Sequence, residues 1–267
     1  MQELDKSVFF KPTGAVQITN KFTLLERKLL NAIIWHHQRQ TFYPAAVYPP
    51  KQPLKPPEYS LPMRDVFRFL GLEKSENYEI VKAALRVLTS TIVEWNIFGY
   101  DRVQEWGVCT FLASGKITGG KLKYRLNPEL IEQIDQPALF AKIHLPVQSQ
   151  VKKRNALVLY EFLLDLLFRS RKDSLRFVVE LDKLYLLLGA GEDTSFKFFN
   201  RDVLKTSAQE ICINTDIEVT YETLRTQRKV SAIAFTVTKK ESFQASFGPR
   251  AILPAADREV PIGLGTA

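Results

Sequence analysis

Apolar residues recur at helical spacing in several segments of the chain, and alternating apolar residues follow them. Thr23 and Glu26 have the spacing of a capping box, so a helix is predicted over 24–37. Two further helices are predicted over 63–70, ending at Gly71, and over 77–95. Residues 97–126 then have strand character with a turn at Gly119-Gly120, and a strand is expected near 16–18.

The same order of elements occurs a second time along the chain. Helices are predicted over 151–170, over 182–188, ending at Gly189, and over 196–211. A short strand is predicted at 176–179, and a hairpin follows at 217–221 and 230–237. Three helices and a terminal hairpin, occurring twice, predict an α+β fold of two tandem winged-helix domains. The predicted domains are 1–145, containing a proline-rich loop over 43–62, and 146–240. Residues 241–267 have no periodicity and are predicted to be a flexible tail.

The charge balance favours a polyanionic partner. The 267 residues include 37 Lys and Arg against 29 Asp and Glu, a net charge of +8 that both halves share. No window resembles a membrane span, and the first six residues carry two acids where a signal peptide needs basic residues. We therefore expect no membrane association and a cytoplasmic location with the nucleoid or a plasmid.

Residues typical of catalytic or metal sites are few. Cys109 and Cys212 lie in apolar segments and are expected to be small buried thiols. The adjacent His36 and His37 diverge by about 100° on a helix, cannot share one metal, and are expected at or near the surface. The segment 107–117 lacks the spacing and the hydroxyl of a phosphate-binding loop. The sequence thus predicts no enzyme activity, no catalytic residue, no metal site and no cofactor.

The helix predicted over 196–211 has one polar side. At 100° per residue its apolar side holds Val203, Leu204, Ala208 and Ile211. Arginine can bind guanine and glutamine can bind adenine in the major groove, so the other side fits base edges. A solvated helix face is the alternative. The candidate DNA-binding residues of this helix are Lys197, Arg201, Lys205, Thr206 and Gln209 beside Asp202.

The predicted hairpin adds a basic segment. Residues 223–240 contain no acid, and the turn over 224–229 is expected to project as a wing whose Arg225, Arg228 and Lys229 hold DNA phosphates. Lys82 and Arg86, one turn apart in the first module, form a weaker parallel set.

The ordered series of these segments resembles the iteron-binding plasmid replication initiators of the Rep_3, or initiator RepB-like, family. The resemblance spans roughly residues 16–240. It is carried by 18–33 in the first module, and in the second by 159–163, 198–204, 208–211, 214–217, 219–222 and 228–235.

This resemblance implies winged-helix domains with pseudo-twofold similarity. It implies that monomers, in equilibrium with homodimers, bind repeated double-stranded origin sites and that dimers repress the chain's own promoter. The first domain would carry the dimer contact and secondary DNA contacts. The implied host partners are the replication initiator, the replicative helicase and, as a further candidate, the sliding clamp. Residues 136–140 resemble a clamp-binding peptide, although a structural role is the favoured interpretation.

Two alternatives to a replication initiator remain open. The first is a winged-helix transcriptional repressor without a replication role. The second is a nicking replication enzyme that forms a covalent link through Tyr43 or Tyr48.

Overall fold

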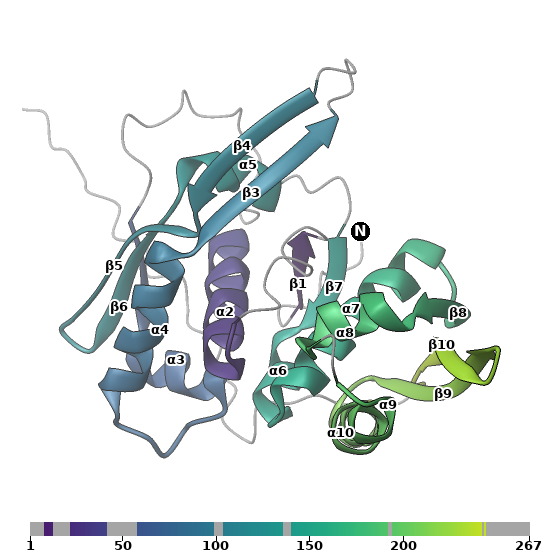
Figure 1. Ribbon diagram of the computed structural model, residues 1–267. Coiled ribbons are helices and arrows are strands. Elements are labelled where there is room, and N and C mark those ends of the chain that lie inside the picture. The colour runs from purple at the N-terminus through teal and green to yellow at the C-terminus, as the bar shows by residue number, and fades with distance from the viewer. Residues whose placement is uncertain are drawn as a thin grey trace, which may run out of the picture.

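The computed structural model describes residues 8–12, 22–41, 58–98, 104–135, 140–191, 194–241 and 243. Its elements form two modules that lie side by side, with a small connecting layer between them (Figure 1). Among the described residues no helix is long and apolar enough to span a bilayer.

The first module packs three helices against a three-stranded antiparallel sheet. Trp35 and Phe69 lie edge to face in its core with ring centroids 4.9 Å apart, and neither ring is exposed. A second hairpin, β3–β4, extends away from the core (Figure 1). The elements are α2 (Leu24–Thr41), α3 (Met63–Leu70), α4 (Tyr78–Ser90) and α5 (Pro128–Asp135), sheet β2 (Tyr59–Pro62), β6 (Lys121–Leu126), β5 (Leu112–Thr118), and hairpin β3 (Ile92–Phe98), β4 (Gln104–Thr110).

The second module has the same order of elements. In each module the strand after the first helix pairs with the second strand of the terminal hairpin, so the strand orders β2-β6-β5 and β8-β10-β9 correspond. Buried Phe235 and half-buried Phe177 stack at 5.8 Å on the sheet face that covers the core. The elements are α7 (Arg154–Ser170), β8 (Ser174–Glu180), α8 (Leu181–Leu188), a helix of three parts over 196–214, β9 (Ile217–Thr226) and β10 (Lys229–Lys239).

Strands β1 (Val8–Pro12) and β7 (Phe140–His144) pair antiparallel between the modules, and α6 (Leu145–Gln150) follows β7. A buried ionic cluster joins this layer to both helices beside it. Glu161 of α7 accepts hydrogen bonds from Lys11 of β1 at 2.8 Å, from Arg27 of α2, and from Asn31 of α2 at 2.7 Å. All four side chains are fully buried. The two modules are therefore joined by polar contacts that are shielded from water.

The local signals that depend on caps and turns are confirmed. Thr23 and Glu26 exchange the two capping-box hydrogen bonds at 2.8 and 3.4 Å. Gly71 and Gly189 end α3 and α8 in the left-handed conformation, with φ of 74° and 72°. Gly119 and Gly120 both have positive φ in the turn between β5 and β6.

Three predicted boundaries are wrong. The helix predicted over 77–95 ends at Ser90, because Thr91 is extended and residues 92–98 pair with β4 instead. Residues 59–62 of the predicted proline-rich loop form β2, whose backbone pairs with β6. The helix predicted over 151–170 begins at Arg154, because α6 occupies 145–150 and residues 151–153 are not helical.

Other predictions fall outside the described residues. These are the strand at 16–18, the remainder of the proline-rich loop over 43–57, residues 136–139 of the clamp-like peptide, and nearly all of the predicted tail over 241–267. Residue 240 is tied to the second module, since the Lys240 ammonium donates to the carbonyls of Cys212 and of Thr215, the latter at 2.8 Å.

Candidate nucleic-acid interface

The third helix of the second module runs continuously from residue 196 to 214 in three parts. These are α9 (Phe196–Phe198), a π-helical turn η2 (Phe199–Leu204) and α10 (Lys205–Asn214). Buried Phe199 and Leu204 are five residues apart, whereas Leu204, Ala208 and Ile211 follow at spacings of four and three. A π turn bonds residue i to i+5 and so lets both Phe199 and Leu204 face the core. Phe199 packs edge to face on Tyr185 at 4.6 Å.

The polar side of this helix faces outward, although the uniform 100° spacing used for its prediction does not hold through η2. The Arg201 side chain is 62% exposed. Lys197, Lys205 and Gln209 are also exposed, and Thr206 is half-buried with its hydroxyl bonded to the carbonyl of Asp202 at 2.7 Å. Val203, predicted on the apolar side, is half-buried.

The hairpin is tighter than predicted. Strands β9 and β10 continue to Thr226 and Lys229, so the turn contains only Gln227 and Arg228 rather than the six residues 224–229. Both turn residues have positive φ, 50° and 74°, as the two-residue turns that match the twist of a hairpin require. Arg225 therefore lies on β9, where its guanidinium donates to the carbonyl of Arg228 at 3.2 Å.

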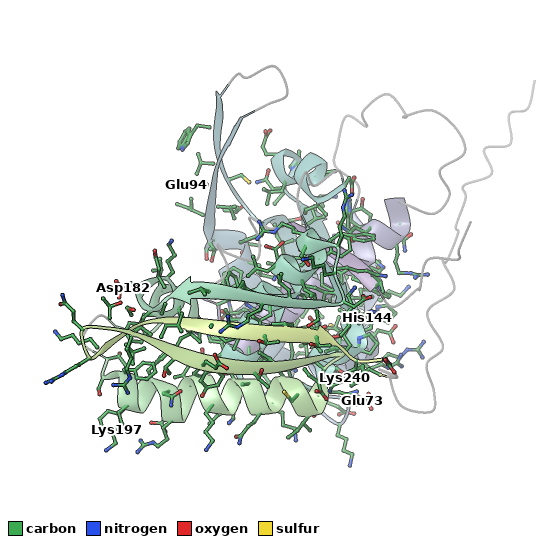
Figure 2. The ribbon with its side chains drawn as sticks, turned by 90° about the vertical axis from the view of Figure 1, so that its right-hand side faces the viewer. Glu73, Glu94, His144, Asp182, Lys197 and Lys240 are labelled. Carbon is green, nitrogen blue, oxygen red and sulfur yellow. The ribbon has the colours of Figure 1, made fainter. Side chains whose placement is uncertain are left out.

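Helix and hairpin lie together along their lengths. The Tyr221 hydroxyl donates to Asn200 at 2.8 Å, and the Val219 amide donates to the Cys212 sulfur at 3.3 Å, so β9 runs antiparallel to the helix. The hairpin turn consequently lies at the end of the module where the helix begins, and Lys197 points away from the sheet there (Figure 2).

The charges of the two hairpins differ in their pairing. In the first module Glu58 forms ion pairs with Lys116 at 3.2 Å and Arg125 at 3.3 Å, and the hydrogen bond from Lys116 lowers the pKa of the Glu58 carboxyl. None of Arg225, Arg228 and Lys229 in the second module has an acidic partner among the described residues, and all three are exposed. Arg225, Arg228 and Lys229 therefore place unpaired positive charge at the turn of the second hairpin. The first hairpin also keeps positive charge, since three cations share the one Glu58 carboxylate and Lys121 has no acidic partner among the described residues.

Helix α4 holds the corresponding position in the first module and carries the weaker candidates. Lys82 and Arg86 are both exposed, but Lys82 is paired with Glu79 at 2.6 Å. Helix α4 lies on the side of the first module that is away from the second module (Figure 1), so the fold does not bring these two residues next to the second-module set.

Two basic residues beside the helix were missed from the sequence. The buried carboxylate of Glu210 on α10 accepts the backbone N–H groups of Lys152 and of Lys153, the latter at 3.1 Å. Both lysine side chains are exposed, so they extend the positive surface at the start of α7. The Lys-Lys-Arg run was visible in the sequence, but its position beside α10 depends on a contact across 57 residues.

The histidines differ from expectation, because both are buried in the first module. His36 Nδ1 lies 2.7 Å from the Tyr124 hydroxyl, and His37 Nε2 lies 2.7 Å from Asp135. Burial lowers the pKa of His36 to about 4. Cys109 and Cys212 are half-buried rather than buried, and burial raises the pKa of the Cys109 thiol to about 11.

No group of three metal-ligating side chains occurs in the part of the chain that the structure describes. Tyr43 and Tyr48, the candidates for a nicking reaction, lie outside that part.

Comparison with known proteins gives two family matches and several similar solved structures. Residues 10–164 match the family model described as initiator replication protein, WH1, and residues 173–237 match the one described as initiator Rep protein, WH2. The crystal structure of the Pi initiator protein in complex with iteron DNA is similar to the chain with a TM-score of 0.66 and 17% sequence identity, covering 89% of this chain and 99% of that one. No curated protein gives a significant match. The prediction of two tandem winged-helix domains in an α+β chain is confirmed.

Proposed function

Because the chain belongs to the initiator replication protein family, we propose that it starts plasmid replication by binding repeated double-stranded sites in the origin. The observation that carries this proposal is the outward polar helix over 196–214 beside a hairpin turn whose Arg225, Arg228 and Lys229 have no acidic partner among the described residues. A helix and a flanking basic hairpin match the division of DNA recognition into base reading and phosphate contact. The Pi initiator, which has the same fold, was crystallised with iteron DNA.

Each part of the surface has a proposed role. Arg201, Lys205 and Gln209 would contact base edges in the major groove, with Thr206 beside them, because their side chains project from one helix. The phosphate contacts would come from the first turn of the helix and from the hairpin, namely Lys197, Arg225, Arg228 and Lys229. Lys82 and Arg86 would make secondary contacts from the first domain. The chain would bind DNA without catalysing a reaction itself.

The first domain, taken as 1–145, would also carry a homodimer contact. Ile92, Val108 and Trp106 share one face of the β3–β4 hairpin, since Ile92 pairs opposite Thr110, Val108 opposite Glu94, and Trp106 opposite Asn96. Ile92 and Trp106 are each 63% exposed. The same face also carries the exposed Glu94. Exposed apolar side chains gathered on one face of a two-stranded ribbon are typical of a protein contact, and dimers joined there would repress the chain's own promoter. Host partners remain predictions of the family resemblance.

Footprinting on the DNA that flanks the reading frame tests the binding proposal. We expect protection of several short repeats by the wild-type chain, and loss of that protection in Arg201→Ala. Lys183→Ala is the matched control, because it removes one exposed positive charge from α8, outside the helix and the hairpin. A wild-type chain that protects no repeat would contradict the proposal.

A plasmid-maintenance assay separates an initiator from a repressor built of the same modules. The flanking DNA, joined to a selectable marker and without another origin, should be maintained only when the chain is supplied in the same cell. Protection of the repeats without maintenance would identify a repressor. Cleavage of supercoiled plasmid in the presence of Mg²⁺ or Mn²⁺ would instead identify a nicking enzyme.

A further inference from the structure

Two neighbours hold the Arg201 side chain in one orientation on the outward helix surface. Its Nε donates to Asp202 Oδ1 at 2.6 Å and its Nη2 donates to Asp202 Oδ2 at 2.7 Å, a bidentate pair. Its guanidinium carbon lies over the Phe198 ring, 5.1 Å from the centroid. The hydrogen bonds raise the pKa of Arg201 and lower that of Asp202, so both groups are charged near neutral pH.

This arrangement uses one edge of the guanidinium and leaves another edge available. Arginine has five N–H donors, and Asp202 takes the Nε–H and one N–H of Nη2. The remaining N–H of Nη2 and both of Nη1 have no acceptor among the described residues. Two parallel donors on Nη1 and Nη2 match the O6 and N7 acceptors of guanine.

Stability does not explain this cluster. An ion pair between side chains that are 62% and 55% exposed contributes little to folding. Phe198 is 52% exposed, and a large apolar ring on a helix surface gains little by burial there. Fixing a flexible arginine before DNA arrives instead lowers the entropy lost on binding.

We propose that Asp202 and Phe198 are positioning residues that present the outer edge of Arg201 to a guanine, so that together they determine the base preference at one position of the site. This inference rests on the proposed function and deepens it. The π turn contributes to this positioning of Arg201, because Phe198, Arg201 and Asp202 all lie in or next to η2, where the helix departs from regular α-helical spacing. Asp202 would act through Arg201 and would not itself contact a base.

Selection from a library of randomised duplexes tests the proposal, because the selection itself yields the preferred sequence. The full chain is used to enrich a consensus, and the affinity for that duplex is compared with the affinities for duplexes that carry one substituted guanine each. We expect Arg201→Ala to abolish the preference for guanine at one position. Asp202→Asn, which keeps the shape but loses the charge, should reduce that preference about 10-fold. Other positions should change less than about 2-fold.

Matched variants distinguish positioning from a general effect on affinity. Phe198→Ala should reduce the same preference about 3-fold, in line with an exposed cation–π contact. In an Arg201→Lys background, Asp202→Asn should have almost no further effect, because lysine cannot offer a bidentate edge. The substituted side chains are exposed, so thermal unfolding should be unchanged and serves as the folding control.

The outcomes separate the inference from the function. A guanine preference that Asp202→Asn leaves intact or strengthens would overturn the inference and leave the initiator proposal standing. An equal loss at every position would also overturn it. A wild-type chain that enriches no sequence would overturn the proposed function and the inference with it.

Discussion

Glu161 supplies the negative charge of the buried ionic cluster between the modules, and replacing it tests how that cluster holds them together. The side chain of Glu161 is fully buried and accepts hydrogen bonds from Lys11, Arg27 and Asn31. Glu161→Gln keeps the size of the side chain but removes its charge. Two buried cations would then lie close together without this counter-charge.

The magnitude follows from the cost of leaving buried charges unpaired. Removing one partner of a buried ion pair costs about 3–5 kcal/mol. Lys11 can limit this loss by giving up its proton, because burial already lowers its pKa to about 8 and the attraction of Glu161 is what opposes that shift. Releasing a proton at pH 7 from a lysine of ordinary pKa costs about 5 kcal/mol at most. We therefore expect Glu161→Gln to lower the free energy of unfolding by about 4 kcal/mol.

Urea denaturation at pH 7 measures this loss, and Lys11→Met is the matched control. That control leaves Arg27 and Glu161 as a balanced pair, so we expect it to cost less than about 2 kcal/mol. The double variant Lys11→Met/Glu161→Gln should be more stable than Glu161→Gln alone, because only one buried cation remains unpaired. A double variant no more stable than Glu161→Gln would refute the charge-based reasoning.

The pH dependence of the free energy of unfolding gives an independent check of the charge state of Lys11. In Glu161→Gln, Lys11 is neutral when folded and charged when unfolded at pH 7, so the unfolded state binds more protons and stability rises with pH. The rise is about 1.4 kcal/mol per pH unit. In the wild type the same rise begins only above the folded pKa of about 8. The free energies of unfolding of the wild type and Glu161→Gln should thus differ by about 1 kcal/mol less at pH 8 than at pH 7. A difference that stays constant would contradict the explanation.

Three further predictions concern the hairpin and the first module. Arg228→Gly should raise the free energy of unfolding by about 1 kcal/mol, because φ of 74° strains a side chain there. The same variant should bind the selected duplex with lower affinity. Stability and affinity that both rise or both fall, measured by denaturation and by binding isotherms, would contradict this. Lys229→Ala should weaken binding to all sequences alike and lower the slope of log affinity against log salt by about one unit, whereas Lys183→Ala should leave the slope unchanged. His36 has a folded pKa of about 4, below its unfolded value of 6.5, so its contribution to stability is present above pH 6.5 and is lost as the pH falls. Relative to His36→Gln, the wild type should lose about 3 kcal/mol between pH 7 and 4, and parallel pH profiles of the two proteins would exclude this role.

The sequence predicted the elements whose limits are set by neighbouring residues. Capping at Thr23, left-handed glycines at 71 and 189 and the alternation of the last hairpin all depend on contacts within a few positions. Strands β1 and β7 were missed because each is short and its partner lies about 130 residues away. The helix predicted over 77–95 was too long for a related reason. Residues 92–98 pair with β4 through backbone hydrogen bonds, and the spacing of apolar residues does not show that pairing.

Burial of polar groups was the least predictable feature. His36 and His37 were expected at or near the surface because, as adjacent residues on a helix, they cannot share one metal. The structure supplies partners inside the first module instead, the buried Tyr124 hydroxyl and the half-buried Asp135 carboxylate, from segments about 90 residues further along the chain. The exposed or buried state of such a group depends on whether a distant segment satisfies its hydrogen bonds.

The outward side of the helix over 196–214 could be predicted because its polar residues recur every four residues. That spacing keeps side chains near one face in an α-helix and in a π turn. Arg201, Lys205 and Gln209 are four residues apart, which keeps them near one face both in a regular α-helix and through the last residues of a π turn. The π turn itself was not predictable from this side of the helix. Its signal lies on the buried side, where Phe199 and Leu204 are separated by five residues and both must reach the core. The same turn places Phe198 and Asp202 around Arg201, so the packing of Phe199 and Leu204 is linked to the orientation of the guanidinium that we propose as a base reader.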